Sequence, residues 1–181
     1  MTTASDLIAN TQPGTTWVLD RDRSTVTFRN KTFWGAATVK GTFSDVEGAG
    51  EVTPAHTVTG HLRIGAASLS TGIGRRDEHL RSADFLDVGN HPVVSVEVHG
   101  ARVTGADTLD LDATLTVKRI ERRLDLPASA KLLDDGAVQI TTHAEINRKE
   151  FGVDGNMLGM IPDTTRIEGD AVFTPLAGES P

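Results

Sequence analysis

Apolar and polar residues alternate along most of this chain, and the alternation limits the folds that are open to it. In one such segment, Val26 and Phe28 share a face, whereas Thr27, Arg29 and Lys31 lie on the other. A period of two is typical of a strand with one buried and one exposed face, as antiparallel sheets have. The pattern recurs in residues 37–43, 60–66, 94–98, 109–117, 138–146 and 166–173.

Turn-forming residues separate these segments, at Glu47-Gly48-Ala49-Gly50, at 105–107 and at 134–136. No strand–helix–strand rhythm is present. We therefore predict an all-β protein of about eight to ten strands, arranged as a barrel or a sandwich. The 181 residues fit one domain, over 15–175, with frayed or disordered tails at 1–14 and 176–181.

Composition narrows the class of protein. The formal net charge of −7 argues against nucleic acid or an anionic membrane surface as a partner. The absence of cysteine excludes disulfides, thiolate metal sites and a cysteine nucleophile. Residues 1–15 lack the features of an export signal, and no apolar run approaches the roughly 18 residues of a membrane span. We predict a soluble, cytoplasmic protein with no stable membrane insertion.

One charged segment interrupts the strands and has a helix-forming pattern. Residues 75–83 contain good helix formers, with Leu80 as the inward candidate, and Ser70 or Thr71 could cap the helix. The segment ends before Pro92, which disfavours helical geometry at the preceding residue. A lone helix in a β-protein is an active centre, a lid or a plug.

The polar residues of this helix suggest chemistry only weakly. Asp77 and His79 are two residues apart and so face different directions, whereas Asp77 and Arg81 are spaced for a surface ion pair. His79, Asp84 and His91 lack metal-ligand spacing. A nucleophile elbow and phosphate-binding loops are absent from the sequence. A hydrolase or lyase would need Asp77, His79 or Asp84 to converge with another polar group in a cleft. We predict no catalysis, metal or cofactor.

The predicted inner faces mix small residues with bulky apolar ones. The small ones are Gly41, Ala66, Ala113, Ala144, Gly169 and Ala171. Two interpretations stay open: bulky neighbours fill the space above these residues, or a cavity remains. An apolar cavity would take an aliphatic chain, because ionised groups cannot enter without partners. A nine-residue strand spans about 30 Å, long enough for an extended chain.

Three further segments allow two interpretations each. Lys118-Arg119-Ile120-Glu121-Arg122-Arg123 is either a clamp for an anionic head group or a solvated turn. The apolar segments Phe33-Trp34-Gly35 and 157–161 either cover an open barrel end as a lid or plug it.

Several of these motifs, taken in order, resemble the YceI-like family of lipocalin-like, polyisoprenoid-binding proteins. The resemblance covers roughly residues 16–175. The motifs are Ser24-x-Val26-x-Phe28, Val39-x-Gly41-x-Phe43, residues 76–87 followed by His91-Pro92, Leu115-Thr116-Val117 with Leu124-x-Leu126, and Arg148-x-x-Phe151-Gly152-Val153. The family's basic hairpin usually has a glycine and a proline where Arg119 and Arg123 stand here.

The resemblance implies an extended antiparallel lipocalin-like barrel of about eight strands, with one short helix near a barrel end. It implies that a long-chain isoprenoid or similar amphiphilic lipid is held inside the barrel and that the protein catalyses no reaction. It also implies that two copies of the chain can form a homodimer. We predict that the lipid contacts Val26, Phe28, Trp34, Val39, Phe43, Leu62, Ile64, Leu115, Ile140, Phe151 and Phe173. The alternative function is a stress-associated interaction module whose filled barrel serves only as a scaffold.

Overall fold

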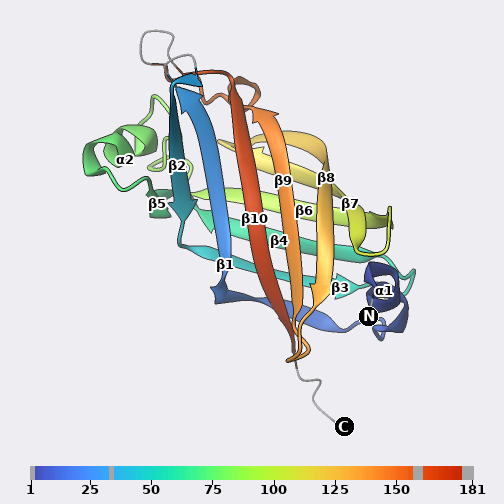
Figure 1. Ribbon diagram of the computed structural model, residues 1–181. Helices are drawn as coiled ribbons and strands as arrows, with labels where there is room; N and C mark the ends of the chain where they lie inside the picture. The colour runs from blue at the N-terminus through green and yellow to red at the C-terminus, as the bar shows by residue number, and fades with distance from the viewer. Residues whose placement is uncertain (1–2, 33–34, 157–160, 177–181) are drawn as a thin grey trace.

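The computed structural model describes residues 3–32, 35–156 and 161–176, and within them ten strands form one antiparallel sheet. The strands are β1 (Thr16–Thr32), β2 (Ala37–Phe43), β3 (Val46–Val52), β4 (Val58–Gly65), β5 (Leu69–Ser70), β6 (Val93–Val103), β7 (Thr108–Val117), β8 (Ile120–Leu132), β9 (Val138–Asn147) and β10 (Thr164–Pro175). Because β10 pairs with both β9 and β1, eight strands close into a barrel (Figure 1). The predicted lipocalin-like barrel is confirmed.

Strand β1 has three partners. One edge pairs with β10, with a register shift between Asp20 and Thr25. The other edge pairs with β3 around Trp17 and with β2 from Val26 onward. The second edge of β2 pairs with β5, and helix α2 (Gly74–Arg81) follows on this side of the barrel (Figure 1). The helix therefore lies beside the edge of β2 that pairs only with the short strand β5.

The predicted turn at 47–50 is wrong, because these residues lie within β3. Gly50 pairs with Gly60 of β4. A Cβ atom on Gly60 would lie 2.7 Å from the carbonyl oxygen of Ala49, which no side chain tolerates. The glycines thus permit a close approach of two backbones rather than a change of direction. The turns predicted at 105–107 and 134–136 lie between β6 and β7 and between β8 and β9.

A second short helix, α1 (Ala4–Asn10), lies in the segment expected to be frayed. Its first turn has a capping box: Asp6 N donates to Thr3 Oγ1 over 3.1 Å, and Thr3 N donates to Asp6 Oδ2 over 3.0 Å. Ala4 is 1% exposed and packs against the core that includes Leu109 and Ala128. Residues 4–10 are therefore part of the folded structure, which has one helix more than the sequence predicted.

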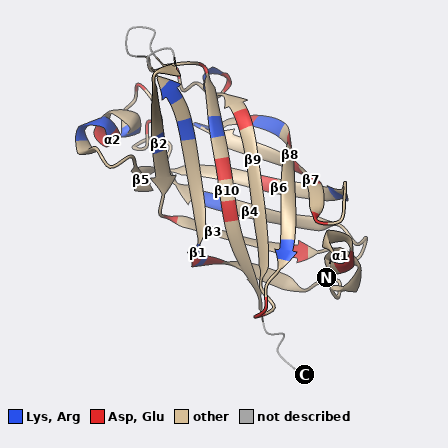
Figure 2. Cartoon of the chain, in the orientation of Figure 1, with Lys and Arg blue, Asp and Glu red and all other residues tan. Residues whose placement is uncertain are grey.

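The inner and outer faces of the barrel differ sharply in polarity. Charged residues of both signs are spread over the strands and over α2 (Figure 2). Along β10, for example, Ile167 and Ala171 border the interior, whereas the charged residues Arg166 and Asp170 do not. Within the described residues, no helix is long and apolar enough to cross a membrane.

Candidate ligand-binding cavity

The barrel encloses an apolar cavity of about 630 Å³. Its wall takes side chains from all eight barrel strands, from β2 and β5, and from both α-helices. The volume falls in the range of pockets that hold small molecules, roughly 300–1,000 Å³. Because the wall is almost entirely apolar, it favours an aliphatic ligand and disfavours ionised groups.

The structure brings most of the predicted contact residues together. Ten of them line the cavity: Val26 and Phe28 from β1, Val39 and Phe43 from β2, Leu62 and Ile64 from β4, Leu115 from β7, Ile140 from β9, Phe173 from β10, and Phe151 from the 3-10 helix η3 (Arg148–Phe151). The eleventh, Trp34, lies outside the described residues. Contact between these residues and a lipid stays a prediction.

The small inner residues divide between the two interpretations. Ala144, Gly169 and Ala171 border the cavity, where they leave space. Gly41 does not, because the ring of Phe28 covers it: a Cβ atom at this position would lie 2.2 Å from Phe28 Cε1. Ala113 is fully buried, with 0% exposure. Part of the interior is therefore filled, and part is open.

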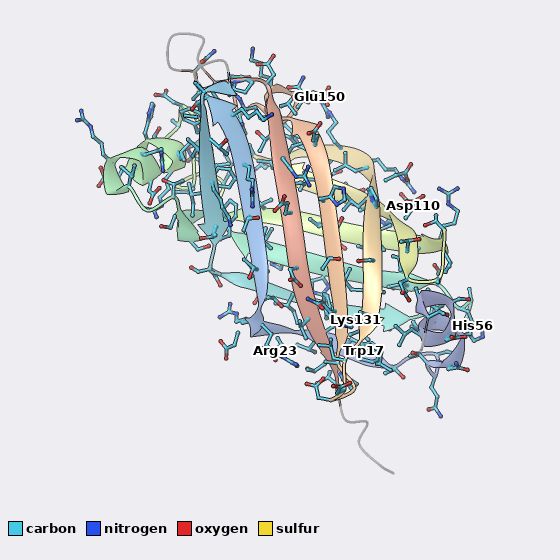
Figure 3. The ribbon with its side chains drawn as sticks, in the orientation of Figure 1. Trp17, Arg23, His56, Asp110, Lys131 and Glu150 are labelled. Carbon is cyan, nitrogen blue, oxygen red and sulfur yellow. The ribbon has the colours of Figure 1, made fainter. Side chains whose placement is uncertain are left out.

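Helix α1 forms one end of the cavity wall, which the sequence analysis missed. Ala4, Leu7, Ile8 and Thr11 all border the cavity. Their spacing of three, four and seven residues places them on one helical face. Trp17 also borders the cavity, and Figure 3 places it at the lower end of the barrel. The signal that could have revealed the helix is the capping sequence Thr3-x-x-Asp6 before this spacing.

Helix α2 borders the cavity with Arg76, His79 and Leu80. It is fixed by Asp77, which is 5% exposed and accepts hydrogen bonds from the backbone N–H of Thr71, over 2.8 Å, and from the Thr71 hydroxyl. These bonds lower the pKa of the Asp77 carboxyl. The predicted cap by Ser70 or Thr71 is wrong: the N-cap is Ile73, without a side-chain bond, and Asp77 reaches back instead.

The other polar residues of this region contact α2 and the segments beside it. Arg81 donates to the carbonyl oxygen of Leu69. The positive charge of Arg81 helps to lower the pKa of Asp77, but Asp77 is buried, so the two residues do not form the predicted surface pair. His79 Nε2 lies 3.3 Å from Asp84 Oδ2, and its ring meets Phe85 edge-on at 5.1 Å. Within the described residues, no three His, Asp or Glu side chains lie close enough together to hold a metal ion.

Arg148 explains the Arg-x-x-Phe-Gly-Val motif. The side chain is buried, with 5% exposure, and burial lowers the pKa of its guanidinium, although Asp163 and Asp154 act in the opposite sense. Its nitrogens donate to four carbonyl oxygens at 2.6–3.1 Å, those of Val153, Gly155, Ile161 and Pro162. Arg148 thus holds together two parts of the β9–β10 connection, residues 153–155 and 161–162.

The basic segment 118–123 is engaged in structural contacts. Lys118 Nζ donates to the carbonyl oxygen of Gly152 over 2.7 Å, and Arg123 forms an ion pair with Asp112. The described part of the cavity wall includes no residue of this segment. The geometry therefore supports the interpretation as a turn and its flanking strand rather than a head-group clamp.

Solved structures share this architecture. BcnA of Burkholderia cenocepacia matches with a TM-score of 0.79 at 17% identity, over 86% of this chain and 99% of its own. A domain from Saccharophagus degradans, described as polyisoprenoid binding and implicated in plant cell wall breakdown, matches with a TM-score of 0.73 at 17% identity, over 88% and 98%. At these identities the likeness shows a shared fold.

Fold and cavity together define a lipocalin-like β-barrel with an apolar interior. The chain belongs to the YceI-like family, whose domain model matches residues 17–173. Among curated relatives, a UPF0312 protein of Azotobacter vinelandii is 31% identical over 96 residues, which are 52% of this chain and 50% of that protein. The matched part of the chain spans about half the length of such relatives.

Proposed function

We propose that this protein binds a long-chain isoprenoid, or a similar amphiphilic lipid, inside the barrel and that it does so without catalysis. The observation that carries the proposal is the apolar cavity of about 630 Å³, walled by every strand of the barrel. A structural neighbour described as polyisoprenoid binding supports the same class of ligand. The alternative, a filled barrel used as a scaffold, requires an interior without this cavity.

We further propose an orientation for the ligand. The end formed by α1 offers the aliphatic side chains of Leu7 and Ile8, which suit a tail. The α2 side offers the polar side chains of Arg76 and His79. Arg76 donates two hydrogen bonds to Thr71 and has further guanidinium N–H groups for a polar head, whereas His79 Nε2 lies 3.3 Å from Asp84. In this orientation the apolar tail is removed from water and the polar head keeps hydrogen-bond partners, as each part of an amphiphile requires.

Native mass spectrometry after mild purification tests the proposal, and it should show a lipid bound to the chain. Ala144→Leu should then weaken the binding of an added prenyl alcohol by about tenfold, because overfilling a site costs roughly 1–3 kcal/mol. Ala67→Leu is the matched control, since Ala67 is exposed and lies outside the cavity wall. Unchanged binding in both variants, or no binding by the parent protein, would contradict the proposal.

Fluorescence tests the orientation. The chain has two tryptophans, so Trp34→Phe leaves Trp17 as the single emitter at the α1 end. A lipid with a bromine at the end of its tail should quench Trp17, whereas a lipid brominated at the head should leave it bright. The reverse result would invert the orientation.

A cytoplasmic location and a homodimer complete the proposal. Cell fractionation and sedimentation of the purified protein test these two points. Recovery in the extracellular fraction, or a single sedimenting species of the monomer mass of 19.3 kDa, would contradict them.

A further inference from the structure

We propose that helix α1 is the end-stop of the cavity, and that Leu7 and Ile8 set the longest lipid tail that the barrel accepts. This inference rests on the proposed binding of an aliphatic ligand. It concerns a segment outside the family match, which begins at residue 17. The length limit would therefore be supplied by residues that the match to the family domain does not include.

The two faces of α1 have different surroundings. Leu7 and Ile8 border the cavity together with Ala4 and Thr11. The intervening residues Ser5, Asp6, Ala9 and Asn10 are exposed. One face of α1 thus closes the space inside the barrel, while the other meets solvent.

Helix α1 is anchored at its start and beyond its end. The backbone N–H of Ala4 donates to the carbonyl oxygen of Ala106, in the β6–β7 turn, over 2.7 Å. Gly14 N donates to the carbonyl oxygen of Val52, in β3, over 2.9 Å. The capping box of Thr3 and Asp6 satisfies the first turn. Contacts to two separate strand ends hold the helix across the barrel rim.

The affinity for an aliphatic ligand depends on the length of its tail. Each methylene that moves from water into an apolar site improves binding, so affinity rises as the tail lengthens. The gain stops when the tail meets a wall that does not move. If α1 is that wall, affinity should level off at the length that reaches Leu7 and Ile8.

The experiment measures the affinity of the full chain for prenyl alcohols of increasing length, by competition with a fluorescent lipid. The double variant Leu7→Ala/Ile8→Ala removes side-chain volume at the end-stop but keeps strong helix formers. We expect its plateau to move to longer tails, with about tenfold tighter binding of the first alcohol beyond the parent limit, as two further buried methylenes would give. Ser5→Ala, on the exposed face, is the control and should leave the plateau in place.

A second variant predicts the opposite shift. Ile8→Phe adds volume at the same place while keeping an apolar contact, so the plateau should move to shorter tails. If the parent binds prenyl alcohols but neither variant moves the plateau, the end-stop is refuted and lipid binding stands. If the parent binds no alcohol of any length, the proposed function itself fails. Unfolding of α1 could also move the plateau of the alanine variant to longer tails. It would not explain a plateau that moves to shorter tails in Ile8→Phe, so the two variants together separate unfolding from a change of volume.

Discussion

Phe28 and Gly41 face each other across β1 and β2, and the Phe28 ring occupies the space that a side chain at position 41 would need. The ring also stands 5.8 Å from that of Phe43, and both phenylalanines border the cavity. A bulky residue over a strand glycine restores contacts that the glycine lacks. This pair therefore defines part of the cavity wall.

Gly41→Ala should reduce lipid binding more than stability. The new Cβ atom would lie 2.2 Å from Phe28 Cε1, at the far end of a side chain that borders open space. We expect the ring to swing into the cavity, with a stability loss of about 1 kcal/mol and a loss of affinity of about tenfold. Thermal melts and lipid titrations measure the two effects. The double variant Phe28→Leu/Gly41→Ala should recover affinity, and a failure to do so would contradict this mechanism.

Arg119→Gly should stabilise the protein by about 1 kcal/mol. Lys118 and Arg119 form the β7–β8 turn with φ angles of 51° and 64°, a left-handed conformation that glycine adopts at less cost. Lys118→Gly is the comparison, because it relieves similar strain but loses the bond to Gly152. Chemical denaturation measures both, and an Arg119→Gly variant no more stable than the parent would refute the strain argument.

At the scale of elements, α2 depends on one buried carboxylate. Asp77 receives both hydrogen bonds from Thr71, and these lower its pKa below the ordinary value of 3.8. A carboxyl group whose pKa falls on folding stabilises the native state above its unfolded pKa. That contribution is lost as the pH falls from the unfolded pKa through the folded pKa.

We therefore expect the start of α2 to loosen below about pH 4, in the range where the unfolded carboxyl group begins to protonate. Amide hydrogen exchange at Thr71 should accelerate as the pH falls, after correction for the intrinsic rate. Asp77→Asn should show fast exchange with little of this pH dependence. Glu78→Gln, on an exposed residue of the same helix, should behave like the parent. Equal pH profiles for Asp77→Asn and the parent would count against the role of Asp77.

The two helices and β3 show what the sequence could predict at this scale. Helix α2 was predictable because it contains good helix formers in a chain of strands. Helix α1 has seven residues, too few for stability in isolation, and its apolar face has value only once a barrel exists to cover it. Strand β3 was mistaken for a turn because Gly48 and Gly50 resemble turn residues until the neighbouring strand is known.

For the whole molecule, an unfilled apolar interior makes stability sensitive to ligand. Side chains such as Ala144 and Ala171 face open space and lack the contacts that close packing supplies. Alternation predicted which residues face inward, because strand geometry fixes their direction. Whether the inward side chains fill the barrel or leave a cavity could not be predicted. That outcome depends on the strand register, on α1 and on which bulky rings cover the small residues.

A bound prenyl lipid should raise the melting temperature. At a free concentration of about one hundred times Kd, binding contributes roughly 2.7 kcal/mol, which corresponds to about 5–10 °C for a domain of this size. Differential scanning calorimetry with and without lipid measures the shift. Ala144→Leu should melt at a similar temperature without lipid and respond less to it. A melting temperature indifferent to lipid would contradict occupation of the cavity.

The pairing of β1 with β10 has a consequence for biosynthesis. Trp17 pairs with Pro175, so closure joins residues that leave the ribosome nearly a whole domain apart. While β10 is still missing, the nascent sheet is open along β1 and its apolar face is uncovered, the state in which chains aggregate or recruit chaperones. The interior becomes a container only when the last strand docks. A lipid can therefore be enclosed either as that seam closes or afterwards, but not before β10 has been synthesised.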